Sequence, residues 1–554
     1  AADQPMHYRD RYTVIFNGEI YNYLELREEL ARSGHVFGTA SDTEVILAAY
    51  AQHGEACVER FDGMFALALW DARERTLFCA RDRFGEKPFY FHHHEGQEFT
   101  FASEMKALFA AGVSRRASRG RLYDFLAHDV VQDPSDGAAT FYEDVRSLEP
   151  AHTVTVSAAR RQSRRYWAIP PRQGAPPLGL EQAGEKLRAL FLESTRRRLR
   201  SDVTLGSSLS GGLDSSTVVC ALRSLGAAEG LRQRTFSARF RQPALDEGQH
   251  IEQVAQAVGL QPNYTWPDAE GLAANLDRLV AHQEEPFSTP SIYAQWEVMR
   301  LAQEHGTIVL LDGQGADEVF AGYHHFFRPL VLGLLRSDGN GWRAEVAAYE
   351  ARHGRSLGVG WRLRMEARAP ALLRALGRVR RHLGRGAEAD WLHPGFAGPH
   401  RQRPVPFVAF RELDAALRFF TQDYGLRNLL RYADRNSMAF SREVRLPFLS
   451  HELVEFAFTL PDSFKLHQGW TKLVLREAAK GLVPESIRLR VDKIGFDTPQ
   501  AEWLGAAPMR QLAAEATAAL ESAEILRRGV ALDAGRQWRV LQARLFLRLT
   551  GELP

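Results

Sequence analysis

A glycine-rich turn, Ser210 to Ser216, constrains the fold of this chain more than any other feature. It follows the apolar run Val203 to Leu209, which is typical of a buried strand, and it precedes a helix that begins near Asp214. Gly211 and Gly212 let the backbone bend sharply, and the amides of such a turn point at an anion held on the positive end of the helix. The pattern therefore predicts a strand, a phosphate-binding turn and a helix in succession, as in parallel α/β sheets.

The residues of this turn favour pyrophosphate as the bound anion. No lysine follows the glycines, so the turn is not the Walker pattern, whose lysine grips the outer phosphates of a nucleotide. Asp214 is a suitable ligand for the magnesium that accompanies pyrophosphate. We therefore expect the chemistry to be cleavage between the α and β phosphates.

A second cluster, Asp312 to Glu318, follows the expected strand Ile308 to Asp312. Its glycines allow close approach to a ligand, and Asp317 and Glu318 supply hard oxygen ligands for magnesium. Because ligands of parallel sheets bind at the carboxyl ends of the strands, we expect the two clusters to meet there. Cations for a phosphate site come later in the chain, and the candidates are Arg445, Lys472 and Lys493.

The first hundred residues have a different pattern, with short strands and two helices. The expected strands are Tyr12 to Phe16, Met64 to Trp70, Thr76 to Ala80 and Pro88 to His92, and the expected helices are Tyr23 to Ser33 and Asp42 to Gln52. This pattern predicts an α+β part with packed sheets.

A proline-rich segment separates this part from the rest. Four prolines between positions 170 and 177 cannot continue a helix, so we expect a linker over residues 166–182, a first domain over 1–165 and a second over 183–554. In the second domain, strands Val203 to Leu209, Thr235 to Phe240 and Ile308 to Asp312 alternate with helices, which predicts a parallel sheet. From Phe320 onward the chain is expected to be mainly helical.

The composition argues against several classes of protein. A net charge of +2 over 554 residues argues against a nucleic-acid partner. The arginine-rich stretch at 374–385 does not change this expectation, because no aromatic residues are interleaved with the arginines to stack on bases. Three cysteines without a C-x-x-C spacing indicate neither a disulfide framework nor a zinc site, and the histidine runs at 92–94 and 324–325 lack carboxylates at ligand spacing. No run reaches the roughly 18 apolar residues of a membrane span, and no signal-peptide pattern begins the chain. We expect a cytoplasmic protein with no membrane partner.

Ordered motifs along nearly the whole chain resemble those of the glutamine-hydrolysing asparagine synthetases. The matching stretches are Phe16 to Asn22, Ser41 to Glu44, Asp62 to Ala66, Arg81 to Gly85, Ser103 with Glu104, Ser210 to Ser216, Gly313 to Glu318, Asp434 with Arg435, Pro447 to Leu449, and Lys493 to Phe496. The resemblance implies a class II, Ntn-type amidotransferase domain with an α+β sandwich, followed by an α/β ATP-pyrophosphatase domain and a helical C-terminal part.

The resemblance also implies a reaction and its cofactors, ATP and Mg²⁺. In the family, the β-carboxylate of aspartate attacks the α-phosphorus of ATP, and ammonia then displaces AMP from the acyl-adenylate. Lys472 and Lys493 would be catalytic, and Asp214 and Asp317 would bind magnesium. The residues implied to bind the nucleotide are Leu209, Ser210, Gly211, Gly212, Asp214, Ser215, Ser216, Ala238, Asp312 and Gly313.

The same resemblance implies a glutamine pocket in the first domain, where Asn17 and Gly18 form the oxyanion hole and Glu19 and Asp42 recognise the substrate. The family's nucleophile is an N-terminal cysteine, whereas this sequence begins with Ala1. We expect that the sequence lacks an N-terminal segment of an ordinary enzyme rather than that the glutaminase step has been lost. Cys57 and Cys79 are not expected to replace the nucleophile, because cysteines within helices and strands normally act as small apolar residues. A homodimer is plausible by resemblance.

Two departures leave the substrate open. Gln314, expected to contact substrate, stands where many asparagine synthetases have glutamate, and Ser450 stands where aspartate is usual. One alternative is therefore a relative that makes an amide from another carboxylic acid in a secondary-metabolite or cell-surface pathway. Another is a catalytically silent interaction subunit, although an intact acidic and basic set argues against silence, namely Asp214, Asp317, Lys472 and Lys493.

Overall fold

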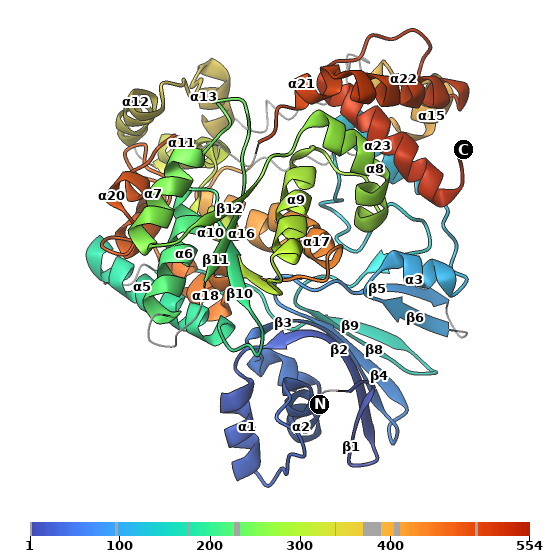
Figure 1. Cartoon of the computed structure of the whole chain (residues 1–554), viewed down its shortest axis with the longest axis vertical. Helices are drawn as coiled ribbons and strands as arrows, with labels where there is room; N and C mark the ends of the chain where they lie inside the picture. Colours follow the sequence, from blue (N-terminus) through green and yellow to red (C-terminus); the bar gives the residue numbers. More distant parts are fainter. Residues whose placement is uncertain are drawn as a thin grey trace.

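The computed structural model describes residues 3–94, 98–174, 177–226, 233–337, 340–368, 389–403, 410–492 and 497–553. Lys493 and the rest of segment 493–496 lie outside the described residues, as does the arginine-rich stretch 374–385. Figure 1 shows a sheet-rich N-terminal part, drawn in blue, below a larger part that holds a second sheet and most of the helices.

The N-terminal part is a sandwich of two antiparallel sheets. The larger sheet has the order β1 (Met6–Tyr8), β2 (Tyr12–Ile20), β3 (Gly63–Asp71), β4 (Thr76–Arg81), β8 (His152–Val156) and β9 (Arg161–Arg165), and the smaller one β6 (Glu98–Ala102), β5 (Tyr90–His94) and β7 (Arg146–Ser147). Successive residues of a strand point to opposite faces. Ala66 and Ala68 of β3 therefore face the smaller sheet, where Phe89 and Phe91 fill the space between the layers.

Phe65, Leu67 and Leu69 of β3 pack under two helices, α1 (Tyr23–Arg32) and α2 (Asp42–His53). Ser41 caps the start of α2, and its hydroxyl accepts a hydrogen bond from the amide of Thr43. A sheet layer on one face and helices on the other confirm the α+β sandwich expected from the sequence.

The second part contains a five-stranded parallel sheet in the order β12 (Pro262–Thr265), β11 (Arg234–Ala238), β10 (Leu205–Ser208), β13 (Val309–Leu311) and β14 (Glu443–Arg445). Helices α6 (Leu213–Gly226) and α7 (Gly248–Val258) lie on one side of it, and α9 (Ser291–Glu304) and α17 (Gly425–Met438) lie on the other (Figure 1). The chain leaves β10 in one direction to β11 and returns on the other side to β13. The strand order therefore reverses between β10 and β13, and ligands of open α/β sheets bind at the carboxyl ends of the strands at such a point.

The sequence patterns did not reveal β12, β14 or α8 (Ala269–Gln283). Strand β12 is the four-residue run Pro-Asn-Tyr-Thr at the sheet edge, where only Thr265 is buried, so no apolar run marks it. Strand β14 has three residues, two of them charged, and is held by its pairing with β13.

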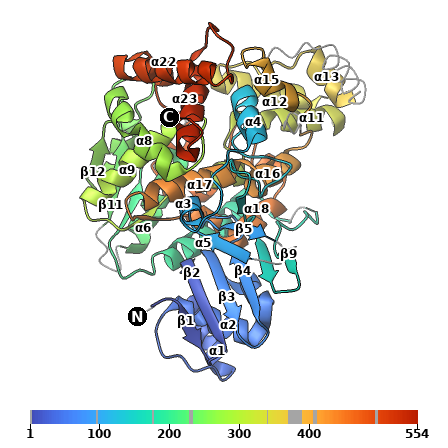
Figure 2. The same ribbon diagram turned by 90° about the vertical axis from the view of Figure 1, so that its right-hand side faces the viewer.

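Helices also make up most of the described chain from Phe320 onward, as expected, and the remaining α-helices follow in chain order. They are α3 (Met105–Ala110), α4 (Arg119–His128), α5 (Leu180–Arg198), α10 (Ala316–Phe320), α11 (Phe327–Ser337), α12 (Gly341–His353), α13 (Trp361–Arg368), α15 (Pro394–Ala397), α16 (Leu413–Gln422), α18 (His451–Thr459), α19 (Leu473–Ala478), α20 (Glu485–Arg488), α21 (Gln500–Gly505), α22 (Ala507–Ser522) and α23 (Ala534–Thr550). Figure 2 shows α4, from the first half of the chain, among α15 and α23. Within the described ranges, every helix is too short or too polar to cross a membrane.

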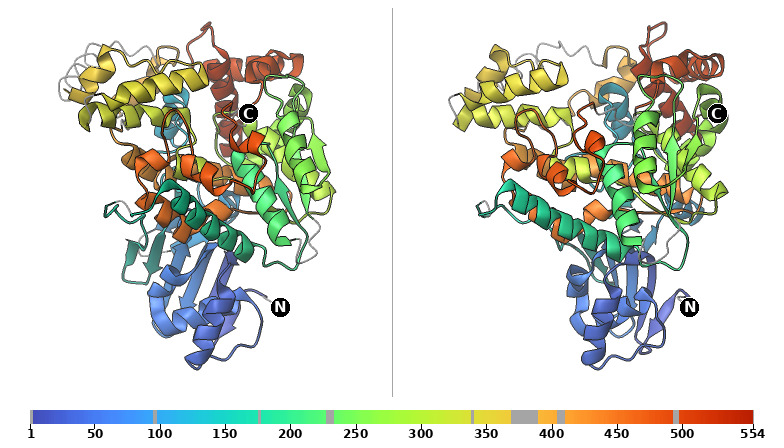
Figure 3. Two further views of the ribbon diagram at one scale, coloured as in Figure 1. Left: turned by 90° about the vertical axis from the view of Figure 1, so that its left-hand side faces the viewer. Right: turned by 60° about the vertical axis from the view of Figure 1, so that its left-hand side comes forward.

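The two parts are joined by a charged junction. Helix α5 lies across the end of the larger N-terminal sheet (Figure 3), where Arg197 forms an ion pair with Asp62 at 3.1 Å. The proline-rich segment is also docked, since the indole of Trp167 donates to Glu455 at 2.7 Å. Helix α5 begins at Leu180, inside the linker range expected from the sequence.

Candidate active site

The two glycine-rich clusters meet at the carboxyl edge of the parallel sheet. The turn after β10 leads into α6, and the loop after β13 leads into α10, on neighbouring strands. Their approach is close enough to require glycine: a Cβ on Gly313 would lie 2.8 Å from the amide nitrogen of Ser215. This contact holds the second loop against the first turn of α6.

The turn after β10 brings several hydrogen-bonding groups close together. The hydroxyl oxygens of Ser210 and Ser215 lie 3.1 Å apart, and the amide of Gly212 donates to Ser210 Oγ at 3.4 Å. Gly211 has a φ of +74°, in the left-handed region that favours glycine. Ser216 is completely buried one residue further along. The arrangement fits an anion above the start of α6.

Lys472 stands between two carboxylates at this edge. Its ammonium contacts Asp214 of α6 and lies 2.6 Å from Oδ1 of Asp317 in α10, and the lysine is 4% exposed. Gly322 leaves room for this contact, because a Cβ there would overlap both Asp317 Oδ1 and Lys472 Cε. The structure therefore brings together three residues that the sequence predicted from distant segments.

The same carboxylates fit a magnesium ion. Magnesium is usually held by one or two carboxylates together with phosphate oxygens, rather than by a complete cage of protein ligands. Asp214 and Asp317 both reach Lys472, so they lie within one ion's surroundings, and the described part of the chain has no cluster of three or more His, Cys, Asp or Glu side chains suited to a metal. A two-carboxylate site completed by a nucleotide is the arrangement that these residues support.

Other expected nucleotide contacts line the same edge. The carboxylate of Asp312 accepts a hydrogen bond from the amide of Ser208 at 3.2 Å, and burial raises its pKa. Leu209 follows β10 and is buried, and Ala238 ends β11. Gln314 projects from the loop after β13, and its Oε1 is buried without a hydrogen-bond partner among the described residues.

The expected glutamine pocket lies at the end of β2. Gly18 has a φ of +141°, and a Cβ there would lie 2.0 Å from the carbonyl oxygen of Met64, so only glycine fits. The side-chain amide of Asn17 donates to Ser103 Oγ at 3.3 Å. Asp42 accepts from the amide of Ile20 at 3.0 Å, and burial raises its pKa.

Glu19 has a partner that the sequence did not reveal. Its carboxylate lies 3.4 Å from the guanidinium of Arg445, which also contacts Glu443 at 2.6 Å. Burial raises the pKa of Glu19 to about 7, although Arg445 opposes the shift. Arg445, a sequence candidate for phosphate binding, is placed at the junction instead, where it also donates to the carbonyl oxygens of Arg198 and Arg200.

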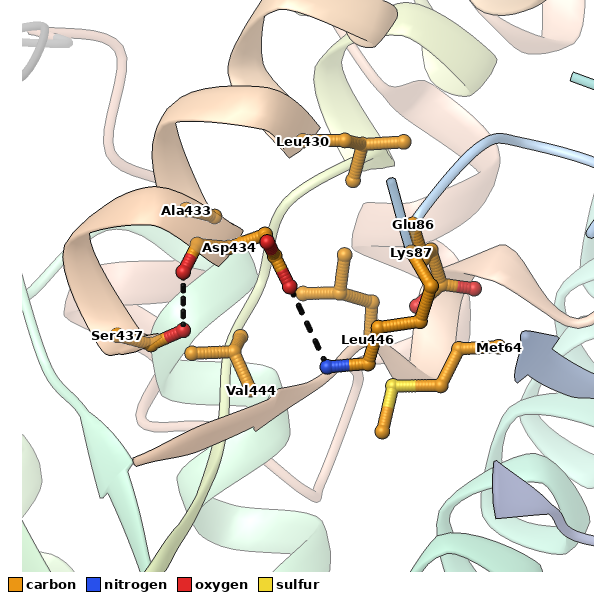
Figure 4. A pocket seen from close by; sticks show the side chains of 9 residues that line it. All are labelled: Met64, Glu86, Lys87, Leu430, Ala433, Asp434, Ser437, Val444 and Leu446. Atoms are coloured by element: carbon orange, nitrogen blue, oxygen red, sulfur yellow. Dashed lines mark hydrogen bonds and ion pairs between the residues drawn. The ribbon is translucent and has the colours of Figure 1, made fainter. Parts of the chain in front are cut away.

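A small cavity lies at the junction between the two parts of the molecule (Figure 4). Its volume of about 10 Å³ is close to the space that one water molecule needs. Met64, Glu86 and Lys87 line it from the N-terminal part; the second part contributes Leu430, Ala433, Asp434, Ser437, Val444 and Leu446. Lys87 Nζ lies 3.4 Å from Asp434 within it, so a buried ion pair joins the two parts.

Three further residues from the sequence analysis lie in environments that give them no evident chemical role. Burial raises the pKa values of Cys57 and Cys79, which disfavours the reactive thiolate. Ser450 precedes α18, but its side chain makes no capping hydrogen bond with that helix. Lys493 lies outside the described residues, so its expected role stays a prediction.

Comparisons with known proteins find relatives along most of the chain. A family model described as asparagine synthase matches residues 186–544, and a glutamine amidotransferase domain model matches residues 1–167. Asparagine synthetase [glutamine-hydrolyzing] 1 of Bacillus subtilis (strain 168) is 32% identical over 90% of this chain and 78% of the relative. A putative asparagine synthetase of Mycobacterium tuberculosis (strain ATCC 25618 / H37Rv) is 33% identical over 91% and 77%. A protein named amidase chyE, from Penicillium rubens, is 27% identical over 91% and 80%.

Proposed function

We propose that this chain, a member of the asparagine synthase family of ATP-dependent carbon–nitrogen ligases, converts aspartate to asparagine. The proposed reaction releases AMP and pyrophosphate. Glutamine is the proposed source of the ammonia, through the N-terminal amidotransferase domain. The observation that carries the proposal is the convergence of Asp214 and Asp317 on Lys472 beside the turn at 210–216. We further propose that the reaction takes place in the cytoplasm.

In the first step, a β-carboxylate oxygen of aspartate attacks the α-phosphorus of ATP. An oxygen–phosphorus bond forms, the bond to the bridging oxygen breaks, and pyrophosphate leaves with the electron pair. The Gly212 amide, the Ser210 and Ser215 hydroxyls and the Lys472 ammonium stabilise the charge of the leaving group, because preorganised donors and cations act strongly in a site that excludes water. Asp214 and Asp317 would hold magnesium, which would supply further neutralisation of phosphate charge.

In the second step, ammonia attacks the carbonyl carbon of the β-aspartyl-adenylate, a carbon–nitrogen bond forms, and AMP leaves as the nitrogen loses a proton. Gln314 is the proposed neighbour of the incoming nitrogen, because its buried amide oxygen is an acceptor on the loop after β13. Leu209, Ala238, Asp312 and Gly313 are the proposed neighbours of the adenosine.

For the amidotransferase domain, we propose that the Gly18 amide and the Asn17 side chain stabilise the oxyanion during glutamine hydrolysis. The backbone conformation at Gly18 supports this role, because a φ of +141°, which other residues rarely adopt, fixes the direction of its amide at the end of β2. Glu19 and Asp42 are proposed to recognise glutamine at the end of the molecule that carries its amine and carboxylate.

The test is an end-point assay with ATP, magnesium and aspartate, run with ammonium and separately with glutamine, in which AMP and asparagine are measured. Asparagine formed from ammonium, with AMP in equal amount, supports the synthetase reaction. AMP and asparagine absent from both reactions would exclude aspartate as the substrate.

A second candidate is the same adenylation and amidation of a different carboxylic acid. Two observations favour a different acid substrate over a different type of reaction: the neutral Gln314 beside the site and the similarity to amidase chyE. ATP–pyrophosphate exchange measured with a panel of carboxylic acids separates the two candidates, since only the true acid supports exchange.

A further inference from the structure

A buried arginine stands behind the turn that follows β10. The side chain of Arg490 is 6% exposed, and its guanidinium donates to the carbonyl oxygen of Gly211 at 3.2 Å. The start of α7 supports the turn from the same direction, because a Cβ on Gly211 would lie 2.7 Å from Cβ of His250. Gly211 is therefore held on its outer side by Arg490 and α7.

Because of the geometry of a peptide unit, this contact also fixes the direction of an amide in the turn. The carbonyl and the N–H of one trans peptide point in opposite directions. Since Arg490 holds the Gly211 carbonyl on the outside, the amide of Gly212 points inward, toward the oxygen of Ser210. With glycine on both sides of this peptide, steric resistance to its rotation is small, and the reversed orientation would present a carbonyl oxygen to the anion.

The charge of Arg490 is already matched by acidic neighbours. Its guanidinium lies 2.7 Å from Glu247, which precedes α7, and 3.1 Å from Asp492, whose side chain is largely exposed. A cation paired in this way contributes little net positive charge to a phosphate nearby. Its distinctive contribution is the fixed direction of its hydrogen bonds.

We propose that Arg490 is a positioning residue that locks the Gly211–Gly212 peptide with its amide toward pyrophosphate. This inference rests on the proposed function of the turn as the pyrophosphate site. It adds a residue that acts on the nucleotide through the backbone of the turn and does not touch the reacting atoms.

Arg490→Met is the first test, read by ATP–pyrophosphate exchange. The KM values for pyrophosphate and MgATP should rise about tenfold, the size of effect that loss of one charge-assisted hydrogen bond produces, while the KM for aspartate changes less than about twofold. Arg442→Met is the matched control, because Arg442 donates to the carbonyl of Thr307 at the opposite end of the sheet. Equal KM values for pyrophosphate in wild type and Arg490→Met overturn the inference.

A double variant separates orientation from charge. Arg490→Met alone removes the arginine partner of Glu247, whereas Glu247→Gln with Arg490→Met also removes the charge of that glutamate and any folding defect it causes. If orientation is the role of Arg490, the double variant keeps the raised KM for pyrophosphate. Recovery of the wild-type KM in the double variant would assign the effect to charge and overturn the inference.

Binding measurements distinguish this inference from the proposed function. Calorimetric titration with magnesium pyrophosphate reports on the turn even if no acid supports exchange. Weaker pyrophosphate binding in both variants then supports the role of Arg490, although aspartate adenylation has failed its own test. Wild-type protein that does not bind pyrophosphate overturns both.

Discussion

The two candidate pockets differ in how much of the molecule each one needs. The pocket at the sheet edge takes Asp214, Asp317 and Lys472 from the second part alone, and the lysine neutralises one of the two carboxylates. The glutamine pocket instead pairs Glu19 with Arg445, which belongs to the other part of the molecule. The first pocket is electrostatically self-contained, and the second is completed only when the parts dock.

This difference indicates where communication between the pockets is possible. The backbone carbonyl of Arg445 accepts a hydrogen bond from the amide of Asp312 at 3.0 Å, at the start of the loop beside the nucleotide pocket. A single residue therefore touches Glu19 through its side chain and the Asp312 loop through its backbone. Loosening the junction should alter the glutamine pocket more than the nucleotide pocket.

Lys472→Ala should have the largest effect and should be confined to the nucleotide pocket. The substitution removes a buried cation and leaves two carboxylates facing the phosphates, so we expect ammonium-dependent synthesis to fall about a thousandfold. AMP release with ammonium and aspartate measures the loss. Lys480→Ala is the control, because the Lys480 side chain is 58% exposed. Activity of Lys472→Ala within tenfold of wild type would remove Lys472 from the site.

Lys87→Met tests the junction itself. Burial alone lowers the pKa of Lys87, but the charges of Asp434 and Glu443 outweigh it and leave the pKa raised. Loss of this lysine leaves Asp434 buried without its 3.4 Å partner, at a cost of about 3 kcal/mol in the free energy of unfolding. Denaturant unfolding measures the change, and Lys106→Met, at an exposed ion pair, is the control.

The contrast between the pockets is tested by nucleotide binding in the same variant. We expect the Kd for MgATP of folded Lys87→Met to stay within about twofold of wild type, because the cited contacts of the nucleotide pocket lie within the second part. A parallel loss of nucleotide affinity would show that the pocket at the sheet edge also depends on docking.

The sequence predicted the nucleotide pocket better than the junction for a physical reason. Glycines and charged residues directly after apolar strands mark the carboxyl edge of a sheet, and α6 begins at Leu213, one residue before the expected start. No such sequence pattern predicts where Arg445 and Arg490 lie in the structure. Their decisive partners include backbone carbonyls of Arg198 and Gly211, and any residue type supplies a carbonyl, so the sequence carries no trace of these contacts.

Gln314→Glu sharpens the account of the nucleotide pocket with a smaller effect. A carboxylate accepts stronger hydrogen bonds from ammonium than a neutral amide does, so the KM for ammonium should fall about threefold to tenfold while the KM for MgATP is unchanged. Initial rates at varied ammonium concentration measure it. A change confined to the KM for MgATP would place Gln314 beside the nucleotide rather than beside the nitrogen.

The smallest expected effect is on the pH dependence of stability, and it should differ between two glutamates that both face arginines of the second part. Burial raises the pKa of Glu19 to about 7, whereas the hydrogen bond from Arg200 lowers the pKa of Glu25 to about 2, against an ordinary value of 4.5. Glu19→Gln and Glu25→Gln should therefore change the pH dependence of stability in opposite directions. Each change should be no more than about 1 kcal/mol, because the two side chains are 36% and 47% exposed and solvent screens them.

The sign follows from proton uptake. Between pH 4.5 and 7 the folded protein keeps a proton on Glu19 that the unfolded chain releases, so Glu19 costs stability as pH rises, and Glu19→Gln should gain relative to wild type over that range. Glu25 stabilises the fold above pH 4.5 and loses this contribution as pH falls toward 2, so Glu25→Gln should be weaker than wild type near neutral pH. Thermal unfolding from pH 2 to 8 measures both. Parallel curves for the two variants would mean that docking does not set the charge of the glutamine pocket, because Glu19 would then titrate like an ordinary surface carboxyl.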